Sequence, residues 1–192
     1  MIIAMSTAYH RKKQPEQVRQ AILDTACHLA AHEGLGKVSI QALADAVGVT
    51  KGGVFHHFPN KKALVHAVFQ HLVGKLDRDI NDRLAEEDGS YGSFTRAYVR
   101  VTFEDEVFHG HEAWRALCMS MANDPDGQAL WADWMAHRLA MHAETDNDPH
   151  LEIVRFAADG VWLAMLSTAE RSVLKDREAV KARLLAMTRP QT

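Results

Sequence analysis

The stretch from Ser39 to Lys61, SIQALADAVGVTKGGVFHHFPNK, constrains the fold of this chain more than any other. Its first part repeats apolar residues at the spacing of one helix face, at Ile40, Leu43, Ala44 and Val47. Ser39 stands where an N-cap is expected, and Gly48 can end this helix because glycine enters the left-handed conformation without a steric penalty. Thr50 can cap a second short helix that ends before Pro59. Two short helices joined by a glycine-containing turn predict a helix-turn-helix.

The second of these helices is expected to offer hydrogen-bond donors and little bulk, through Lys51, Gly52, Gly53, His56 and His57. Lysine and histidine can donate to phosphate oxygens or base edges, and the second helix of this motif enters the DNA major groove. Each glycine costs a helix roughly 1 kcal/mol relative to alanine, but it lets the backbone approach another surface closely. Near the start of the first helix, Ser39 and Gln41 are expected to reach flanking phosphates. The apolar residues predicted to clamp the two helices together are Val47, Val49, Val54, Phe55 and Phe58. A helical hairpin that binds nothing is the alternative.

Residues 20–66 resemble the DNA-binding head of the TetR family of bacterial transcriptional repressors. The matching residues are Ala42-Leu43-Ala44, Ala46-Val47-Gly48-Val49, Thr50-Lys51-Gly52, Phe55, His57-Phe58, and Lys61 with Leu64. The resemblance implies DNA contacts by Lys51, Gly53, His56, His57 and Lys61, and a small-molecule pocket in the remainder of the chain. The family usually has a phosphate-contacting tyrosine where this chain has Phe55, so we expect that contact to be lost or to pass to His56 or His57.

The distribution of charge agrees with a DNA-binding head. Residues 1–62 contain eight Lys and Arg against four Asp and Glu, a net charge of +4, and because the whole chain carries −3 the remaining residues carry −7. A basic head on an acidic body is expected when one end of a protein meets phosphate.

The cysteines and the hydropathy pattern narrow the class of protein. Cys27 and Cys118 show no metal-ligand spacing and are expected to be small buried hydrophobes in a reducing cytoplasm. Residues 1–5 are too short for a signal-peptide core, and no apolar run reaches transmembrane length. We therefore expect a cytoplasmic protein with no membrane partner.

The sequence divides into three parts. Residues 1–14 are predicted to be a flexible basic arm, which is either a solvated tail or a segment that touches the DNA backbone or minor groove. Residues 15–60 are predicted to be the helix-turn-helix domain, with Pro15 at the first position of a helix that Gly34 and Gly36 end. Residues 61–192 are predicted to form a linking helix followed by a ligand-binding and dimerisation domain.

This third part is expected to be a helical bundle, which makes the whole chain all-α. Asn60 can cap a long helix in which apolar residues recur every four positions, at Leu64, Val68, Leu72, Leu76, Ile80 and Leu84. Because 3.6 residues make a turn, this stripe winds around the helix, so its start and its end should face different cores. Further helical patterns cover residues 93–108, 112–123, 126–144, 149–172 and 176–188, and none of these stretches alternates as a strand does.

Large soft side chains are concentrated in the body, which suits an adaptable apolar cavity as well as an ordinary core. The predicted lining of a ligand cavity is Tyr98, Phe103, Trp114, Trp131, Trp134, Met135 and Arg138. Arg138 is expected either to pair with a carboxylate or to be solvated.

The two C-terminal helical patterns are the predicted dimer surface, through Val154, Ala158, Val161, Met165, Leu184 and Met187. The phrase from Ala157 to Leu163 also resembles the dimerisation helix of many members of the family. A monomeric bundle that turns these residues inward is the alternative. A two-fold dimer would place two heads on a roughly palindromic operator.

No enzyme motif is present in the sequence. His109 and His111 are close in sequence, but tetrahedral metal sites need more converging ligands, so neither a metal site nor a cofactor is expected. We therefore predict a homodimeric repressor that leaves its double-stranded operator when a small apolar or aromatic effector binds. A ligand-independent or activating regulator, or an all-α carrier or enzyme, remains the alternative.

Overall fold

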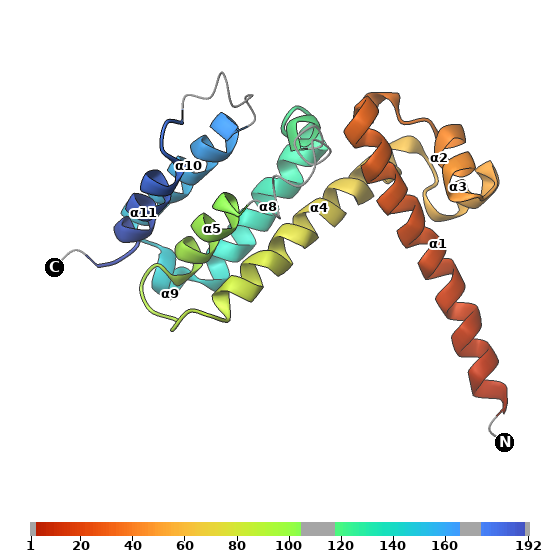
Figure 1. The fold of residues 1–192 in the computed structure, drawn as a ribbon. Coiled ribbons are helices and arrows are strands. Elements are labelled where there is room, and N and C mark those ends of the chain that lie inside the picture. The colour runs from red at the N-terminus through yellow and green to blue at the C-terminus, as the bar shows by residue number, and fades with distance from the viewer. Residues whose placement is uncertain (1–2, 105–117, 166–173, 191–192) are drawn as a thin grey trace. The chain divides into compact units, whose positions relative to one another are not determined.

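The structure, a computed structural model, describes residues 3–104, 118–165 and 174–190, and over these ranges it contains helices and no strand (Figure 1). The all-α prediction is confirmed. The chain divides into two compact units, residues 1–71 with 111–128, and residues 72–110 with 129–192. Helices α4 (Lys61–Leu84) and α8 (Pro125–Met141) each contribute residues to both units.

The first unit is built on α1 (Ile3–Glu33), η1 (Leu35–Lys37), α2 (Ile40–Val47) and α3 (Lys51–His57). Helix α1 packs against η1, α2 and α3, and α2 packs against α3. The buried apolar side chains of these elements are Ile22, Leu23, Ala26, Ala30, Leu35, Val38, Leu43, Ala44, Val54 and Phe58. The three-helix head expected from the sequence is therefore formed around one apolar core.

Helix α1 begins at Ile3, so the prediction that Pro15 stands at its first position is wrong. Proline inside a helix lacks one N–H and so removes one backbone hydrogen bond. The residues before it, including Ala4, Met5 and Ala8, have good helix propensity and continue the helix on that side. Gly34 ends the helix as expected, with φ of 85° and its N–H donating to the Ala30 carbonyl.

Helix α4 contributes apolar residues to both units, as its apolar stripe predicts. Leu64 and Val68 are buried and fall in the first unit, whereas Leu72, Leu76 and Ile80 are buried and fall in the second. Asn60 caps the helix, because its Oδ1 accepts from the Ala63 N–H at 2.8 Å. One continuous helix therefore belongs to two separate cores.

The second unit is organised around α5 (Ser93–Phe103), which packs against α9 (Ala143–Asp146), α10 (Pro149–Met165) and α11 (Arg177–Met187). Every residue of α5 except Arg100 is buried. Its N-terminal end has no local side-chain cap, and the Asp146 carboxylate accepts from the Phe94 and Thr95 N–H groups instead. A distant acidic residue thus satisfies the free N–H groups that begin this helix.

The helix boundaries differ from the predicted ones by a few residues. Helix α5 ends at Phe103 rather than at residue 108, while Pro125 and Pro149 are the first residues of α8 and α10, a position that proline favours. Asp176 caps α11 as expected by accepting from the Ala179 N–H. Most of the predicted helix over residues 112–123 lies outside the described residues. Its described part is helical from residue 118 to residue 122.

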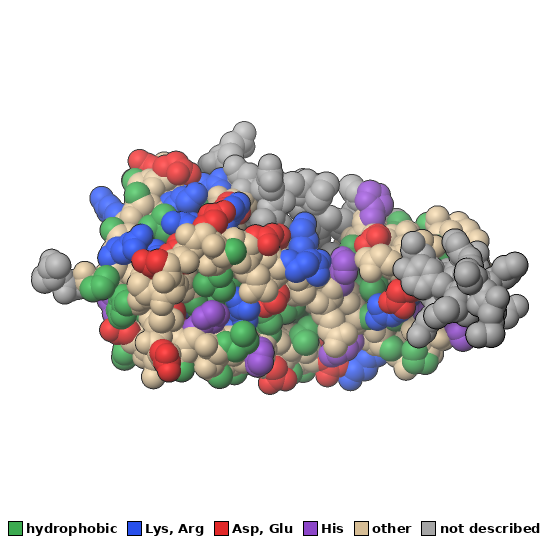
Figure 2. Space-filling view, turned by 90° about the horizontal axis from the view of Figure 1, so that it is seen from below, with side chains coloured by type: hydrophobic (Ala, Val, Ile, Leu, Met, Phe, Trp, Pro, Cys, Tyr) green, Lys and Arg blue, Asp and Glu red, His purple; other side chains and the backbone are tan. Residues whose placement is uncertain are grey.

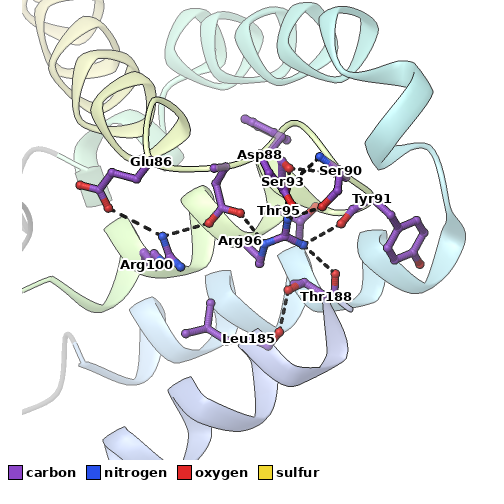
Figure 3. A network of polar contacts seen from close by, with 12 residues as sticks. Glu86, Asp88, Ser90, Tyr91, Ser93, Thr95, Arg96, Arg100, Leu185 and Thr188 are labelled. Atoms are coloured by element: carbon purple, nitrogen blue, oxygen red, sulfur yellow. Dashed lines mark hydrogen bonds and ion pairs between the residues drawn. The ribbon is translucent and has the colours of Figure 1, made fainter. Parts of the chain in front are cut away.

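A polar cluster joins the loop before α5 to the end of α11 (Figure 3). Arg96, with 1% of its side chain exposed, pairs with Glu87 at 2.7 Å and donates to the carbonyls of Tyr91 and Thr188. Its remaining amino group donates to the hydroxyls of Ser90 and Ser93. A Cβ at Gly92 would lie 2.4 Å from the Thr188 carbonyl oxygen, and Gly92 also has φ of 76°, so only glycine fits there. All three guanidinium nitrogens of Arg96 are paired inside the protein.

The two cysteines are free, as expected, with Cys118 buried and Cys27 half-buried. Burial raises the pKa of the Cys27 thiol to about 11, with Asp24 adding to the effect, and raises that of Cys118 to about 12. Within the described ranges, no helix is both long and apolar enough to cross a bilayer.

Candidate nucleic-acid interface and ligand site

The α2–turn–α3 segment is defined by its caps. The Ser39 hydroxyl accepts from the Ala42 N–H, and the Thr50 hydroxyl accepts from the Gly53 N–H, both at 3.0 Å. Gly48 ends α2 in the left-handed conformation, with φ of 77°. The local prediction for this segment is confirmed, and because the Ser39 hydroxyl only accepts in this cap, its O–H stays available to donate to a phosphate.

Helix α3 is anchored by one side chain and leaves the others outside. Val54 is fully buried, whereas Lys51, Gly52, Phe55 and His56 are exposed. Phe55 was predicted to clamp the two helices, and this prediction is wrong because 41% of it is exposed. A short helix turns only one narrow face to the core. Val54 on that face and Phe58, which follows directly after the helix, are the side chains that fill the core here.

Nothing within the protein requires glycine at position 52. A Cβ there would meet only the Thr50 Oγ1, at an ordinary distance of 3.8 Å, and the backbone does not have a positive φ. At Gly53 a Cβ would lie 3.4 Å from the same oxygen, which is closer but still tolerable. The helix therefore gives up stability at Gly52 for no internal benefit, which is expected when a surface outside the protein approaches its backbone.

Several predicted DNA contacts already have partners within the first unit. The Gln41 amide donates to Asp45, and the Lys61 ammonium donates to the Gly36 carbonyl at 2.8 Å. The neighbouring Lys62 pairs with Asp126 at 2.7 Å. Lys61 keeps two further N–H groups, because an ammonium group has three. Gln41 and Lys61 thus share their donors with groups of the protein. Lys51 is exposed on α3 and is therefore better placed than Lys61 to direct its whole charge to a phosphate.

The two histidines at the end of α3 lie edge to face, with ring centroids 5.3 Å apart. Burial is the largest cause that lowers the pKa of His57, and the neighbouring His56 and Arg19 lower it further. His57 is therefore neutral near pH 7 in the free protein and can gain a proton if a phosphate approaches. Arg19 lies over the ring of Phe58, 5.2 Å from its centroid, so it braces the end of α3.

Charge is mixed on the face of the molecule shown in the space-filling view (Figure 2). Acidic side chains lie beside basic ones there, and histidines are scattered among them. Over the described residues, this face therefore shows no continuous basic surface (Figure 2). A DNA contact is indicated instead by the net charge of +4 over residues 1–62.

In the second unit, the predicted ligand residues of α5 are fully committed to the core. Tyr98 is buried and donates from its hydroxyl to Asp159 at 2.5 Å, and Phe103 is buried as well. Burial raises the pKa of both groups of this pair, the Tyr98 hydroxyl and the Asp159 carboxyl. Trp114 lies outside the described residues.

The predicted residues of α8 lie against α4. The Trp134 indole donates to Asp77 at 2.7 Å, and its ring lies 5.0 Å from that of Trp131. Trp131, Trp134 and Met135 are all half-buried. The structure thus brings the α8 part of the predicted lining together on one side of α4.

Arg138 is a buried polar residue of this unit whose side chain is only partly paired. Only 4% of it is exposed, and its Nη1 donates to Asn81 at 2.8 Å and lies 3.5 Å from Asp77. Its Nε and Nη2 are buried and have no hydrogen-bond partner. An unsatisfied buried donor costs roughly 1–3 kcal/mol, and burial accordingly lowers the pKa of this guanidinium. The prediction that Arg138 is solvated is wrong, because the side chain is buried. The alternative, a carboxylate partner, is found in part: only Nη1 lies near the Asp77 carboxylate.

Two residues beside Arg138 were not among the predicted ligand contacts. The His142 ring stacks on Phe94, with centroids 5.0 Å apart and planes 5° from parallel, and the Arg138 guanidinium lies 5.3 Å from the centroid of Phe94. The His142 Nε2 is also buried without a partner. His142 follows directly after the end of α8, and its N–H donates to the Arg138 carbonyl, so the spacing of four residues could have revealed the pair.

A hollow of about 340 Å³ lies next to this cluster. It is lined by Leu84, Glu87, Gly89, Ser93, Met141, His142, Glu144 and Thr145. Of these residues only His142 belongs to the cluster around Arg138, and none belongs to the predicted lining. The hollow and the predicted lining thus share no residue, although Met141 of the hollow lies on α8, the helix that carries four of the predicted residues.

The predicted dimer residues lie on the inner side of the second unit. Val154, Ala158, Val161 and Leu184 are buried there, as in the alternative in which the bundle turns these residues inward. Met187 is exposed, and the Met165 side chain lies outside the described residues. Helix α10 is apolar on two sides, and the side facing solvent consists of Ile153, Phe156, Gly160 and Leu163. The sequence showed both stripes, but only packing against α5 shows which one faces inward.

No group of three or more potential metal ligands occurs among the residues that the structure describes. His109 and His111, the pair weighed as a metal site, lie outside those residues. His137 is exposed, and His142 stacks on Phe94 as described above.

Two family models match the chain. One, described as bacterial regulatory proteins of the tetR family, matches residues 22–68, which contain α2, α3 and the start of α4. The other, described as the tetracyclin repressor-like C-terminal domain, matches residues 92–189, which contain α5 and α8 to α11. The first model thus covers the helix-turn-helix, and the second covers the helices around α5.

Individual proteins give the same result. The HTH-type transcriptional repressor KstR2 of Rhodococcus jostii (strain RHA1) is 33% identical over 160 residues, which cover 77% of this chain and 78% of that protein. The HTH-type transcriptional regulator BetI of Pseudomonas aeruginosa (strain LESB58) is 30% identical over 95 residues, 48% of each, so the chain spans about half the length of this relative. The crystal structure of the multidrug binding protein EbrR complexed with imidazole has the same fold, with a TM-score of 0.68 at 20% identity over 91% of each chain.

Proposed function

Since the chain belongs to the TetR family of bacterial transcriptional regulators, we propose that it is a homodimeric repressor that binds a palindromic operator in the cytoplasm. The observation that carries this proposal is α3, a short helix that buries Val54 and leaves Lys51, Gly52 and His56 outside. Such a helix has nothing to gain from these residues within the protein. The matched family is one of regulatory proteins, which agrees with a sequence that lacks catalytic motifs.

The proposed DNA contacts are Ser39, Gln41, Lys51, Gly52, Gly53, His56, His57 and Lys61. Lys51 and the histidines supply cations and donors for phosphates and base edges, while Gly52 allows the backbone to come close. The caps at Ser39 and Thr50 hold α2 and α3 at a fixed angle, so these groups reach the groove without further ordering. Lys61 contributes with the N–H groups that it does not donate to Gly36.

The proposed dimer surface is the outer side of α10. Phe156 is 66% exposed, and Ile153 and Leu163 lie beside it one turn before and two turns after. Gly160 between them would meet nothing if it carried a Cβ, so a second helix can approach closely at that point. Replacing Phe156 by Asp should convert a dimer to a monomer in light scattering, whereas Asp133→Ala at an exposed position of α8 should not. A wild-type protein that is monomeric at micromolar concentration would contradict this part of the proposal.

The proposed switch is a shift between two populations. An effector bound in the second unit favours a position of α4 that mis-spaces the two heads on the operator. Helix α4 can carry such a change because its apolar residues belong to both cores. A ligand moves the equilibrium only as far as its affinities for the two states differ.

The experiment is an operator-binding assay with a fragment from the promoter of the protein's own gene. We expect retention of the fragment at low salt and a steep fall of log K with log salt, because phosphate contacts release counterions. Failure to retain any double-stranded fragment at low ionic strength would overturn the proposal. Transcription from the same promoter with and without the protein then separates repression from activation.

A further inference from the structure

We propose that the effector of this protein is an organic acid, and that Arg138 binds its carboxylate through Nε and Nη2. The proposal deepens the function proposed above, and it rests on that function only for the effect of the acid on DNA binding. Its starting point is a guanidinium with 4% exposure and two N–H-bearing nitrogens that have no partner.

The two orphaned nitrogens lie on the same edge of the guanidinium. Nε–H and one Nη2–H leave that edge in parallel, and together they match the two oxygens of a carboxylate. The third nitrogen, Nη1, points away from this edge and is already held by Asn81 at 2.8 Å. Arg138 is thus fixed in position by Asn81, and the edge that binds carboxylates is buried without a partner.

The same unit shows how this edge is used when a carboxylate is present. Arg83 donates from Nε to Glu104 Oε1 at 2.7 Å and from Nη2 to Glu104 Oε2 at 3.1 Å. The atoms that Arg83 uses in this pair are the two atoms that Arg138 leaves free. A carboxylate from outside the chain would give Arg138 the arrangement that Glu104 gives Arg83.

The neighbouring charges favour a single negative charge on the ligand. Asp77, 3.5 Å from Nη1, already balances part of the Arg138 charge, and it also accepts from the Trp134 indole. Burial and the charge of Arg138 lower the pKa of His142, which is therefore neutral near pH 7. With one cation and no protonated histidine, the site fits a carboxylate better than a doubly charged phosphate.

One aromatic ring and an adjoining hollow lie near Arg138. The Arg138 guanidinium lies 5.3 Å from the centroid of the Phe94 ring, and the His142 ring stacks on the same Phe94 at 5.0 Å. His142 and Met141 also line the hollow of about 340 Å³, together with Leu84 of α4. Glu87, which lines it as well, is neutralised by Arg96 and Arg100 at 2.7 Å and 2.9 Å. The second carboxylate of the lining, Glu144, is exposed to solvent, which screens its charge. An acid with an aromatic or aliphatic body therefore fits here, with its carboxylate at Arg138 and its body toward Phe94, Met141 and Leu84.

The test is calorimetric titration of the full-length protein, without DNA, by matched pairs of probes. The acids are sodium benzoate and sodium octanoate, the neutral partners are benzamide and octanamide, and inorganic phosphate is the third arm. We expect the acids to bind the wild type at least about tenfold more tightly than the amides and than phosphate, since hydrogen bonds to a charged group are lost with the amide.

Variants assign the binding to the proposed edge. Arg138→Gln should weaken benzoate binding by at least about tenfold, and Arg138→Lys should weaken it too, because an ammonium group lacks the fork. Arg83→Gln is the matched control: it removes an arginine whose edge Glu104 already occupies, so it should leave benzoate binding unchanged. Equal binding of acid and amide, or of benzoate by wild type and Arg138→Gln, would overturn the proposal. So would the absence of binding by both acids at millimolar concentration.

A measurement without any ligand guards against misfolded variants. If Arg138 is an open acid site, Arg138→Met should melt at the wild-type temperature or above it, because it removes a buried charge that is only partly paired. A marked fall in melting temperature would show that Arg138 serves the fold instead. Operator retention by the wild type is measured separately. Failure to bind DNA would contradict the proposed regulator but not the acid site, and failure to bind the acids would contradict the acid site but not the regulator.

Discussion

Charged groups are paired and buried in the polar cluster around Arg96, whereas they are exposed on the surface of α3. Arg96 is buried, and each of its guanidinium nitrogens is paired with an atom of the same unit. Lys51 and His56 on α3 are exposed, and Gly52 between them is not required by any close internal contact. Groups that are satisfied inside the protein contribute to its stability, whereas groups held outside by a rigid frame are free for a partner. Changes in the first region should therefore be seen in unfolding, and changes in the second in DNA binding.

The largest expected effect is on stability and concerns Arg96. Arg96→Met leaves the Glu87 carboxylate with fewer partners in a buried place and removes the contacts to the Thr188 and Tyr91 carbonyls. Breaking a buried ion pair on one side typically costs about 3–5 kcal/mol. Thermal or urea unfolding measures this loss, and the exposed Arg183 on α11 gives the control, since Arg183→Met should cost far less. Equal stability of the two variants would remove the distinction drawn between the two regions.

The next effect is on operator affinity and concerns Lys51. Lys51→Ala should weaken operator binding by about tenfold and lower the slope of log K against log salt by about one, because one phosphate contact is lost. Its unfolding should stay within about 0.5 kcal/mol of the wild type, as for other exposed substitutions. The control is Lys175→Ala, which makes the same charge change at an exposed position of the second unit. If both variants lose affinity equally, net charge rather than α3 would be responsible.

Gly52 should move the two measurements in opposite directions. Gly52→Ala is expected to stabilise the protein by about 0.5–1 kcal/mol, because alanine is the better helix former and its Cβ meets no neighbour closely. It should also weaken operator binding several-fold, since the added methyl group keeps the backbone of α3 away from the groove. Gly74→Ala, inside α4, is the control for the helix effect alone. Operator binding by Gly52→Ala that matches the wild type would show that close approach is not needed there.

The smallest effect is a pH dependence that arises at His57. Its pKa in the free protein lies below the ordinary value of 6.5, so the unfolded chain binds more protons, and stability should fall slightly as the pH drops through that value. A phosphate nearby would favour the protonated ring, so operator affinity should rise between pH 8 and pH 6, by less than about tenfold per pH unit for one proton. Binding measured across this range by the wild type and by His57→Gln tests the assignment. The variant should show a flatter profile, and identical profiles would exclude His57.

The sequence was sufficient for the head because its decisive interactions are local. The caps at Ser39, Thr50 and Asn60 and the left-handed Gly48 each depend on residues a few positions away, and all four are found as predicted. Local reasoning failed at Phe55, where the choice between core and solvent depends on how much of α3 the rest of the head can cover. It failed in the same way on α10, whose two apolar stripes look alike until α5 packs against one of them.

The ligand site was less predictable than the head for a related reason. The sequence pointed to α8 and to Arg138, but it assigned the cavity to a set of tryptophans and other large side chains. Asp77 of α4 accepts from Trp134, and Asp159 of α10 accepts from Tyr98, so these side chains are engaged by residues more than fifty positions away in the chain. Polar partners at such distances follow no spacing rule, and the buried groups that lack a partner are found at Arg138 and His142, beside Phe94.

The sequence by itself determined the helical character of the chain, the turn between α2 and α3, and the donors that α3 presents. These features depend on periodicity, on caps and on glycine, all of which act over a few residues. Only the tertiary structure decided which side of α10 faces solvent, which arginine is fully paired, and which arginine keeps one edge open. Those outcomes depend on burial in the folded protein. A buried polar group that lacks a partner cannot bond to water instead, and an apolar side chain is removed from water only where another element packs over it.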